Sequence, residues 1–270
     1  MFDGDEKSYG KMAPLLKRVL IADPQVASAR MLSNIMRDVA RSHCWHATTT
    51  ARALKIAETS DPQLIVVEIG PDQVDGLEFA KTLRRSTWSS RKAPIITITG
   101  VATAASILAA RDAGVHEFLL KPYSLKDLVR RLGAVTLKER DWVEAMDYIG
   151  PDRRRFNSGE YGGKLKRRND GSETPLQQKI NQALKIIRAA VAASDTDPEQ
   201  AMRAMLTQAT TIQGLATDFR MTLAASEFHR HLFKSARAGQ GFTRAEAADW
   251  AAPMLVFMTK DADARPAKAA

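Results

Sequence analysis

The sequence predicts an α/β fold with a doubly wound, five-stranded parallel sheet, followed by a basic linker and a small all-α region. Three features of its 270 residues support this prediction. Over residues 17–137, short runs rich in β-branched residues alternate with longer amphipathic stretches, as in a parallel sheet with helical crossovers. Residues 138–173 lose that pattern and are rich in glycine and arginine, so we expect a linker or arm. Residues 174–258 show apolar residues at helical spacing.

The first region alternates expected strands and helices without a break. Apart from a weaker second strand, each expected strand is a mainly apolar run, which suits a buried strand. The expected strands cover residues 19–22, 45–48, 64–68, 94–99 and 117–120. After each of them, apolar residues recur three to four positions apart, which is typical of an amphipathic helix. The expected helices cover residues 26–40, 50–59, 77–85, 103–113 and 124–135.

Helix start signals mark the last region. A capping residue stands directly before a proline at residues 174–175 and again at residues 197–198, and residues 243–246 fit a capping box. We therefore expect helices over residues 176–193, from 198 to about 219 with a continuation toward 238, and from 244 toward 250, interrupted near Pro253. The two ends lack a core pattern, so we expect a flexible N-terminus over residues 1–16 and a disordered tail over residues 259–270.

Composition narrows the class of protein. One cysteine excludes a disulfide framework and a cysteine-based zinc module. No apolar run approaches the roughly 18 residues of a membrane span, and the acidic residues near the N-terminus do not fit a signal peptide, so we expect a cytoplasmic protein. Lys and Arg outnumber Asp and Glu by 40 to 31, a formal charge of +9. Such a charge fits nucleic acid, anionic lipid, an acidic ligand or a solubilising surface.

Polar residues stand where the expected strands end. Asp23 follows the first strand and Glu68 ends the third, while Thr99 ends the fourth and Lys121 follows the fifth. In an open α/β sheet, functional residues gather at the carboxyl ends of the strands. The sequence therefore predicts one site at this edge, containing two acids, a hydroxyl and a lysine.

These residues, in this order, resemble the receiver domain of two-component response regulators. Three further segments support the resemblance: Asp75-Gly76 seven positions after Glu68, the sequence AGVHEF at residues 113–118, and Lys-Pro-Tyr at residues 121–123. The resemblance implies a CheY-like, flavodoxin-type fold and a role in phosphorelay signal transduction in a bacterium. It also implies signalling partners, namely a histidine kinase, a phosphotransfer protein or an output partner, which meet the surface formed by residues 103–135.

The site departs from the family pattern at the phosphoacceptor. The family places an aspartate at the position of Glu68 and an acid pair where this chain has Ala22-Asp23, and the loop proline comes one position early, as Pro71. Glutamate extends the carboxylate by about 1.5 Å, and phosphoryl transfer tolerates little misplacement. A missing carboxylate leaves Asp23 as a weakened magnesium ligand, and no cofactor is required.

We therefore expect a pseudo-receiver, a protein-interaction adaptor that is not an enzyme and has no catalytic residues. In this interpretation Glu68 is a permanent carboxylate that reaches toward Thr99 and Lys121, as a phosphoryl group does in the family. Phe118 stands at the position of the family's switch aromatic, although an apolar residue on a buried strand is more often simply part of the core. The alternatives are that Glu68 and Lys121 form a residual ion pair of little value, or that the site is a working phosphoacceptor.

The excess positive charge is concentrated in the expected arm. Seven Lys or Arg and two acids lie between residues 151 and 168, a local net charge of +5. Arginine binds phosphate bidentately, and interleaved aromatics stack on bases. The arm loosely resembles arginine-rich extensions through which some bacterial receiver-like proteins bind cyclic-di-GMP, and the alternative is a solvated basic linker. Duplex DNA is not an expected partner, because no DNA-binding motif follows. The candidate ligand-binding residues are Arg153, Arg154, Arg155, Arg167 and Arg168.

A short segment of the last region suggests another role. Residues 229–235 resemble the His-x-x-Lys segment of histidine phosphotransfer domains, with His231 and Lys234 at the matching positions. Ser235 replaces the glycine that usually follows the lysine. A surface histidine beside basic residues is common on helices, so phosphotransfer at His231 is the lesser alternative.

Overall fold

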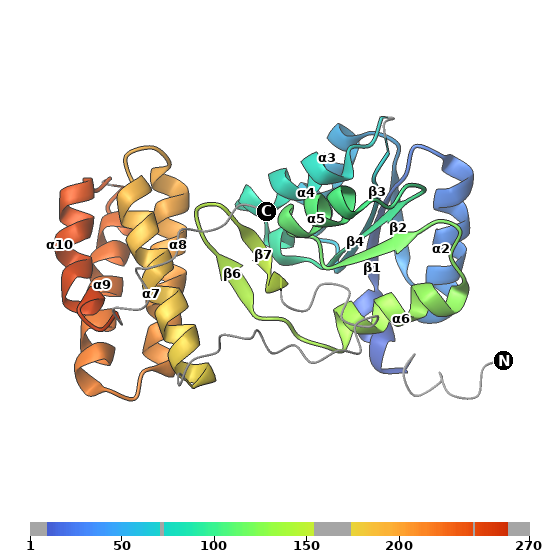
Figure 1. Cartoon of the computed structure of the whole chain (residues 1–270). Helices are drawn as coiled ribbons and strands as arrows, with labels where there is room; N and C mark the ends of the chain where they lie inside the picture. The colour runs from blue at the N-terminus through green and yellow to red at the C-terminus, as the bar shows by residue number, and fades with distance from the viewer. Residues whose placement is uncertain (1–9, 71–72, 154–173, 240, 259–270) are drawn as a thin grey trace. The chain divides into compact units, whose positions relative to one another are not determined.

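Two compact units make up the part of the chain that the structure describes. This computed structural model describes residues 10–70, 73–153, 174–239 and 241–258 (Figure 1). The first unit contains residues 10–143 and 148–153, and the second contains residues 144–147 and 174–258. The expected tail over residues 259–270 and most of the expected arm lie outside the described residues.

A five-stranded, all-parallel sheet forms the centre of the first unit. Its strands are β1 (Arg18–Ala22), β2 (His43–Ala47), β3 (Leu64–Glu68), β4 (Ile95–Thr99) and β5 (Glu117–Leu120). They lie in the order β2-β1-β3-β4-β5, and each neighbouring pair is parallel. This is the flavodoxin-like order of a doubly wound sheet. The predicted fold class is confirmed.

Helices cover both faces of the sheet (Figure 1). On one face lie α2 (Val26–Ala40) and α6 (Leu125–Thr136), and on the other lie α3 (Thr50–Ser60), α4 (Gly76–Arg85) and α5 (Ala104–Asp112). Four of these helices start at a side chain that accepts a hydrogen bond from the backbone N–H groups of the first turn, which satisfies donors that lack a partner within the helix. The four capping residues are Thr49, Asp75, Thr103 and Ser124.

Alternation along the strands divides the apolar core between the two faces. On β1, Val19 and Ile21 pack with α2 and α6, whereas Leu20 packs with α3 and α4. All three side chains are fully buried. Burial of each such side chain contributes about 1.5–3 kcal/mol. This packing on both faces fixes the positions of the strands, and with them the polar residues at the strand ends.

The start of the chain differs from the expected flexible N-terminus. A 3₁₀ helix, η1 (Ala13–Leu16), precedes β1. Met12 and Leu16 are fully buried in the core on the α2 side of the sheet. Two large apolar residues four positions apart give this short segment enough buried surface to become ordered. Residues 1–9 lie outside the described residues.

The expected linker over residues 138–173 also differs in its first part. Residues 142–144 and 149–151 form β6 (Trp142–Glu144) and β7 (Ile149–Pro151), a two-stranded sheet. Gly150 has a positive φ and lies very close to Gly114. A Cβ on Gly150 would lie only 2.7 Å from the Cα of Gly114. Strands of three residues are too short to show a periodic pattern, so the composition suggested an arm.

A buried arginine joins this extension to the sheet. The Arg84 side chain, 1% exposed, donates to the carbonyl oxygens of Gly114 at 3.0 Å and Ala93 at 3.0 Å. Its guanidinium lies 5.3 Å from the ring centroid of Trp142 in β6, a cation–π contact. Burial lowers the pKa of Arg84 to about 9, so the group is still charged at neutral pH.

The helices of the second unit pack around one apolar core. They are α7 (Pro175–Ala193), α8 (Pro198–Leu215), α9 (Phe219–Arg237) and α10 (Arg244–Leu255). Asp218 caps α9, so the single helix expected from residue 198 toward 238 is two helices. Pro253 lies inside α10 instead of interrupting it. Within the described residues, no helix is long and apolar enough to cross a membrane.

Candidate functional site

The predicted site residues meet at the carboxyl edge of the sheet. Asp23 directly follows β1 and Glu68 is the last residue of β3, while Thr99 ends β4 and Lys121 directly follows β5. The parallel register aligns Glu68 with Ile98, one residue before Thr99, and Thr99 with Leu120, one residue before Lys121. The four side chains therefore lie at the same edge of the sheet, because the short parallel strands end in register.

Lys121 lies against both acids of the site. Its Nζ donates a hydrogen bond to Glu68 Oε1 at 2.8 Å and lies 3.6 Å from Asp23 Oδ2. Asp23 is buried, and its Oδ1 accepts a hydrogen bond from the backbone N–H of Gln25 at 2.7 Å. The site is thus a two-carboxylate, one-ammonium cluster with an excess of one negative charge when all three groups are ionised.

Burial opposes the charge of Glu68. The pKa of its carboxyl is raised, mainly because the group is withdrawn from water; the Asp23 carboxylate raises it further, and the hydrogen bond from Lys121 only partly offsets these effects. Glu68 Oε2 is buried and has no hydrogen-bond partner among the described residues. Burial raises the pKa of the neighbouring Tyr123 hydroxyl as well, with smaller contributions from the charges of Asp23 and Glu68.

Thr99, at the edge, and Phe118, inside β5, are not part of this cluster. The Thr99 hydroxyl donates to the carbonyl oxygen of Val101 at 3.3 Å and accepts from the backbone N–H of the same residue at 3.2 Å. Glu68 therefore pairs with Lys121, while Thr99 closes its own local turn. Phe118 is buried on β5 and belongs to the core on the α5 side of the sheet.

The loop before α4 comes very close to Glu68. A Cβ on Gly76 would lie 2.6 Å from the carbonyl oxygen of Glu68, closer than real Cβ contacts allow. Asp75 caps α4 by accepting from the backbone N–H groups of Leu77 and Glu78. The Asp75-Gly76 pair thus ends the loop tightly against β3. Pro71 lies outside the described residues.

The donor set does not fit a divalent cation. Magnesium requires several oxygen ligands in octahedral geometry. Here the Lys121 ammonium contacts both Asp23 and Glu68, so a cation that used these two carboxylates would compete with a positive charge already beside them.

The comparison with known families agrees with this geometry. A family model described as "Response regulator receiver domain" matches residues 19–133, which include all of the sheet except Arg18 and all four edge residues. This region is a response regulator receiver domain. The match places residues 19–133 in the receiver domain family of two-component response regulators, and the rest of the chain lies outside it.

Two curated relatives each match less than half of this chain. The transcriptional regulatory protein PdtaR of Mycobacterium tuberculosis is 29% identical over 117 residues, which cover 43% of this chain and 55% of that protein. The KDP operon transcriptional regulatory protein KdpE of Escherichia coli is 31% identical over 132 residues, 49% of this chain and 56% of that protein. This chain thus spans about half the length of these curated relatives.

Solved structures give a similar match. The chemotaxis protein CheY4 of Vibrio cholerae has a TM-score of 0.42 and 22% sequence identity, and the match covers 44% of this chain and 98% of that chain.

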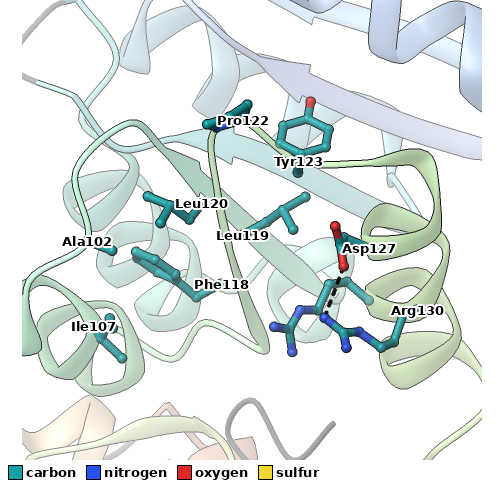
Figure 2. Close-up of a pocket in the computed structure, with 10 residues that line it drawn as sticks. Ala102, Ile107, Phe118, Leu119, Leu120, Pro122, Tyr123, Asp127 and Arg130 are labelled. Atoms are coloured by element: carbon teal, nitrogen blue, oxygen red, sulfur yellow. Dashed lines mark hydrogen bonds and ion pairs between the residues drawn. The ribbon is translucent and has the colours of Figure 1, made fainter. Parts of the chain in front are cut away.

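One outer surface of the receiver domain is hollowed. A pocket of about 320 Å³ lies beside β5, and side chains of the loop after β4, of α5 and of α6 surround it. Figure 2 shows Phe118 and Ile107 on one side of the hollow and Arg130, bonded to Asp127, on the other. Leu108, Leu120 and Leu125 are exposed on the same elements. This is the surface where the family resemblance predicts partners.

A buried charge cluster that the sequence analysis did not identify lies at the opposite end of β5. Glu117, fully buried, pairs with Arg131 of α6 at 3.0 Å and with Arg140. Burial raises the pKa of Glu117, and the two arginines oppose that shift. The only sequence signal for this cluster is a glutamate at the start of an apolar strand. That signal does not indicate which basic residues pair with it.

The arginine-rich arm is described only at its start. Arg153 pairs with Asp112 at 3.2 Å, and its guanidinium lies 3.8 Å from the ring centroid of Tyr148. This residue is thus engaged within the receiver unit. Arg154, Arg155, Arg167 and Arg168 lie outside the described residues, and binding of a cyclic dinucleotide stays a prediction.

The candidate phosphotransfer histidine lies against an aromatic ring. His231 of α9 stacks on Trp250 of α10, with ring centroids 5.3 Å apart and planes 15° apart. Lys234, one turn further along α9, is exposed. Phosphotransfer at His231 stays a prediction, and the stacked imidazole also has a packing role.

Proposed function

We propose that this receiver domain is a pseudo-receiver, a two-component signalling module that acts through protein contacts and not through phosphorylation. Glu68 is its constitutive carboxylate. The supporting observation is the 2.8 Å contact between Lys121 Nζ and Glu68 Oε1. The lysine that holds a phosphoryl group in the family is thereby already engaged with a negative charge.

Two physical arguments favour a non-catalytic role. The longer glutamate side chain displaces the carboxylate by about 1.5 Å, and in-line transfer loses much of its rate with a misplacement of about 1 Å. The cation that neutralises transferring phosphate in the family has a poor donor set here, because Lys121 contacts both Asp23 and Glu68. The protein is therefore proposed to be an adaptor that requires no cofactor.

The hollowed surface beside β5 is the proposed partner site. Exposed leucines beside charged residues such as Arg130 and Asp127 give the apolar centre and polar rim that protein interfaces use. A histidine kinase, a phosphotransfer protein or an output protein is the class of partner that a receiver domain implies. The Glu68–Lys121 pair holds the adjoining edge in one state.

A phosphorylation assay tests the catalytic half of the proposal. The full chain is incubated with acetyl phosphate and magnesium, and its intact mass is measured beside that of a phosphorylatable receiver domain as positive control. We expect no phosphoryl gain on this chain. Stoichiometric labelling that disappears in Glu68→Gln would overturn the proposal.

A capture experiment tests the adaptor half. The immobilised chain is exposed to purified histidine kinases and phosphotransfer proteins of the source organism, and the bound protein is compared between the wild type and Leu120→Asp. We expect Leu120→Asp to lose the partner, and Leu176→Asp, on an exposed site of α7, to retain it. Equal capture by both variants would place the partner surface elsewhere.

A further inference from the structure

The second unit has an apolar groove on its surface, formed by α9, α10 and the residues that follow α10. Its volume is about 600 Å³. The floor consists of Leu223, Ala224, Trp250, Pro253, Val256 and Phe257. This site is separate from the receiver domain and has no role in the proposed function above.

Several large side chains at this groove face water instead of the helical core. Val256 is 75% exposed and Leu223 is 50% exposed. Phe219, one helical turn before Leu223 and therefore on the same side of α9, is 76% exposed. Contiguous exposed apolar surface of this kind marks an interaction site.

Charges of opposite sign stand toward the two ends of the groove. The helices α9 and α10 are joined by a short loop and run antiparallel (Figure 1). Arg220 lines the groove where α9 begins, and Asp249 lines it beside His231, which lies further along α9. The Arg220 side chain is 81% exposed and only loosely paired with Asp218, at 3.6 Å.

The remaining charges of the groove do not change this polarity. Asp249 has no ion pair among the residues that the structure describes. Glu227, which lies between Arg220 and Asp249 along the groove, is neutralised by Arg230 on the next turn of α9. The groove is therefore an apolar strip with a basic end and an acidic end.

We infer that this groove is a two-fold symmetric interface with a second copy of the same chain. A two-fold rotation about an axis through the middle of the strip brings the basic end of one copy to the acidic end of the other. Arg220 of each copy then meets Asp249 of its partner. Such a strip is complementary to itself in charge, whereas a strip with one sign of charge would repel its copy.

Sedimentation velocity of the full chain over a series of concentrations tests this inference. We expect a monomer–dimer equilibrium that Val256→Asp abolishes. Arg220→Glu and Asp249→Arg should each raise the dimer dissociation constant by about tenfold or more, because each change acts twice in a two-fold dimer. The double variant Arg220→Glu/Asp249→Arg exchanges the signs and should recover most of the affinity.

A matched control separates the interface from general charge effects. Arg237→Glu makes the same charge change at an exposed position of α9 outside the groove, and it should leave the equilibrium unchanged. Helical circular dichroism confirms that each variant is folded. A monomer at every concentration, a dimer that tolerates Val256→Asp, or folded single variants whose combination regains no affinity would each overturn the inference.

Discussion

At the residue scale, the Glu68 carboxylate positions its partner more than it stabilises the fold. The side chain is only 14% exposed, and burial together with the Asp23 carboxylate raises its pKa in spite of the contact with Lys121. Buried ion pairs often have this balance, because desolvation of two charges exceeds their mutual attraction. The pair therefore fixes the place of Lys121 at the edge of the sheet without being a source of stability.

The variant Glu68→Gln should be more stable than the wild type at neutral pH. The pKa of the Glu68 carboxyl is higher in the folded protein than its unfolded value of 4.5. The carboxyl therefore contributes fully to stability below pH 4.5, and this contribution is lost as the pH rises through the folded pKa. The gain from glutamine should therefore be largest near pH 7 and should shrink as pH falls toward 4.5. Urea unfolding at several pH values measures the difference between the two proteins.

A carboxylate in an exposed pair provides the control. Glu58 pairs with Lys55 at 2.9 Å on the surface of α3, where such pairs contribute less than about 1 kcal/mol. Glu58→Gln should give no comparable gain at pH 7. A loss of stability at neutral pH in Glu68→Gln would mean that the buried pair is net stabilising.

At the element scale, one side chain holds together segments that are distant in the sequence. Arg84 lies in the last turn of α4 and donates to backbone carbonyl groups before β4 and before β5, while its guanidinium lies against Trp142 of β6. The imidazole of His116 accepts from the backbone N–H of Ile95 beside it. These contacts bind the amino-terminal edge of the sheet, opposite the candidate site.

Arg84→Met should destabilise the receiver unit by about 3 kcal/mol or more, because it leaves buried carbonyl groups without donors. Lys81→Met, an exposed change on the same helix, should cost less than about 0.5 kcal/mol. Urea denaturation followed by tryptophan fluorescence measures both. Similar small effects in the two variants would show that water replaces the Arg84 hydrogen bonds.

The sequence predicts the regular elements of this chain better than its polar contacts. Apolar strands and helical spacing identify the sheet and place Glu68 and Lys121 at one edge, because side-chain period follows from backbone geometry. Nothing in the pattern distinguishes Arg84 from the exposed Arg85 that follows it. The bond between Thr99 and Val101 likewise depends on a rotamer and a local turn, which residue spacing does not determine.

At the scale of the whole molecule, the two units have separate apolar cores. Buried residues of the sheet and its helices form two clusters, and those of α7–α10 form a third that shares no buried residue with them. Each unit therefore has its own source of cooperative stability.

Calorimetry of the full chain should show two unfolding transitions. Phe79→Ala should lower only the transition of the receiver unit, and Phe228→Ala only that of the helical unit, since both phenylalanines are fully buried in their own cores. Loss of a buried phenylalanine costs about 3–5 kcal/mol, which corresponds to a shift on the order of 10 °C. A single transition that moves with either variant would show that the units unfold together.

The buried pairing of Glu117 with two arginines determines where this receiver domain can be divided from its neighbours. Arg131 comes from α6, but Arg140 comes after the last helix of the domain. A fragment that stops at Thr136 would leave Glu117 with one arginine and remove Trp142 from Arg84. A fusion protein that joins this receiver domain to a different C-terminal region should therefore keep the chain through Arg153. That boundary lies well beyond the last strand of the five-stranded sheet.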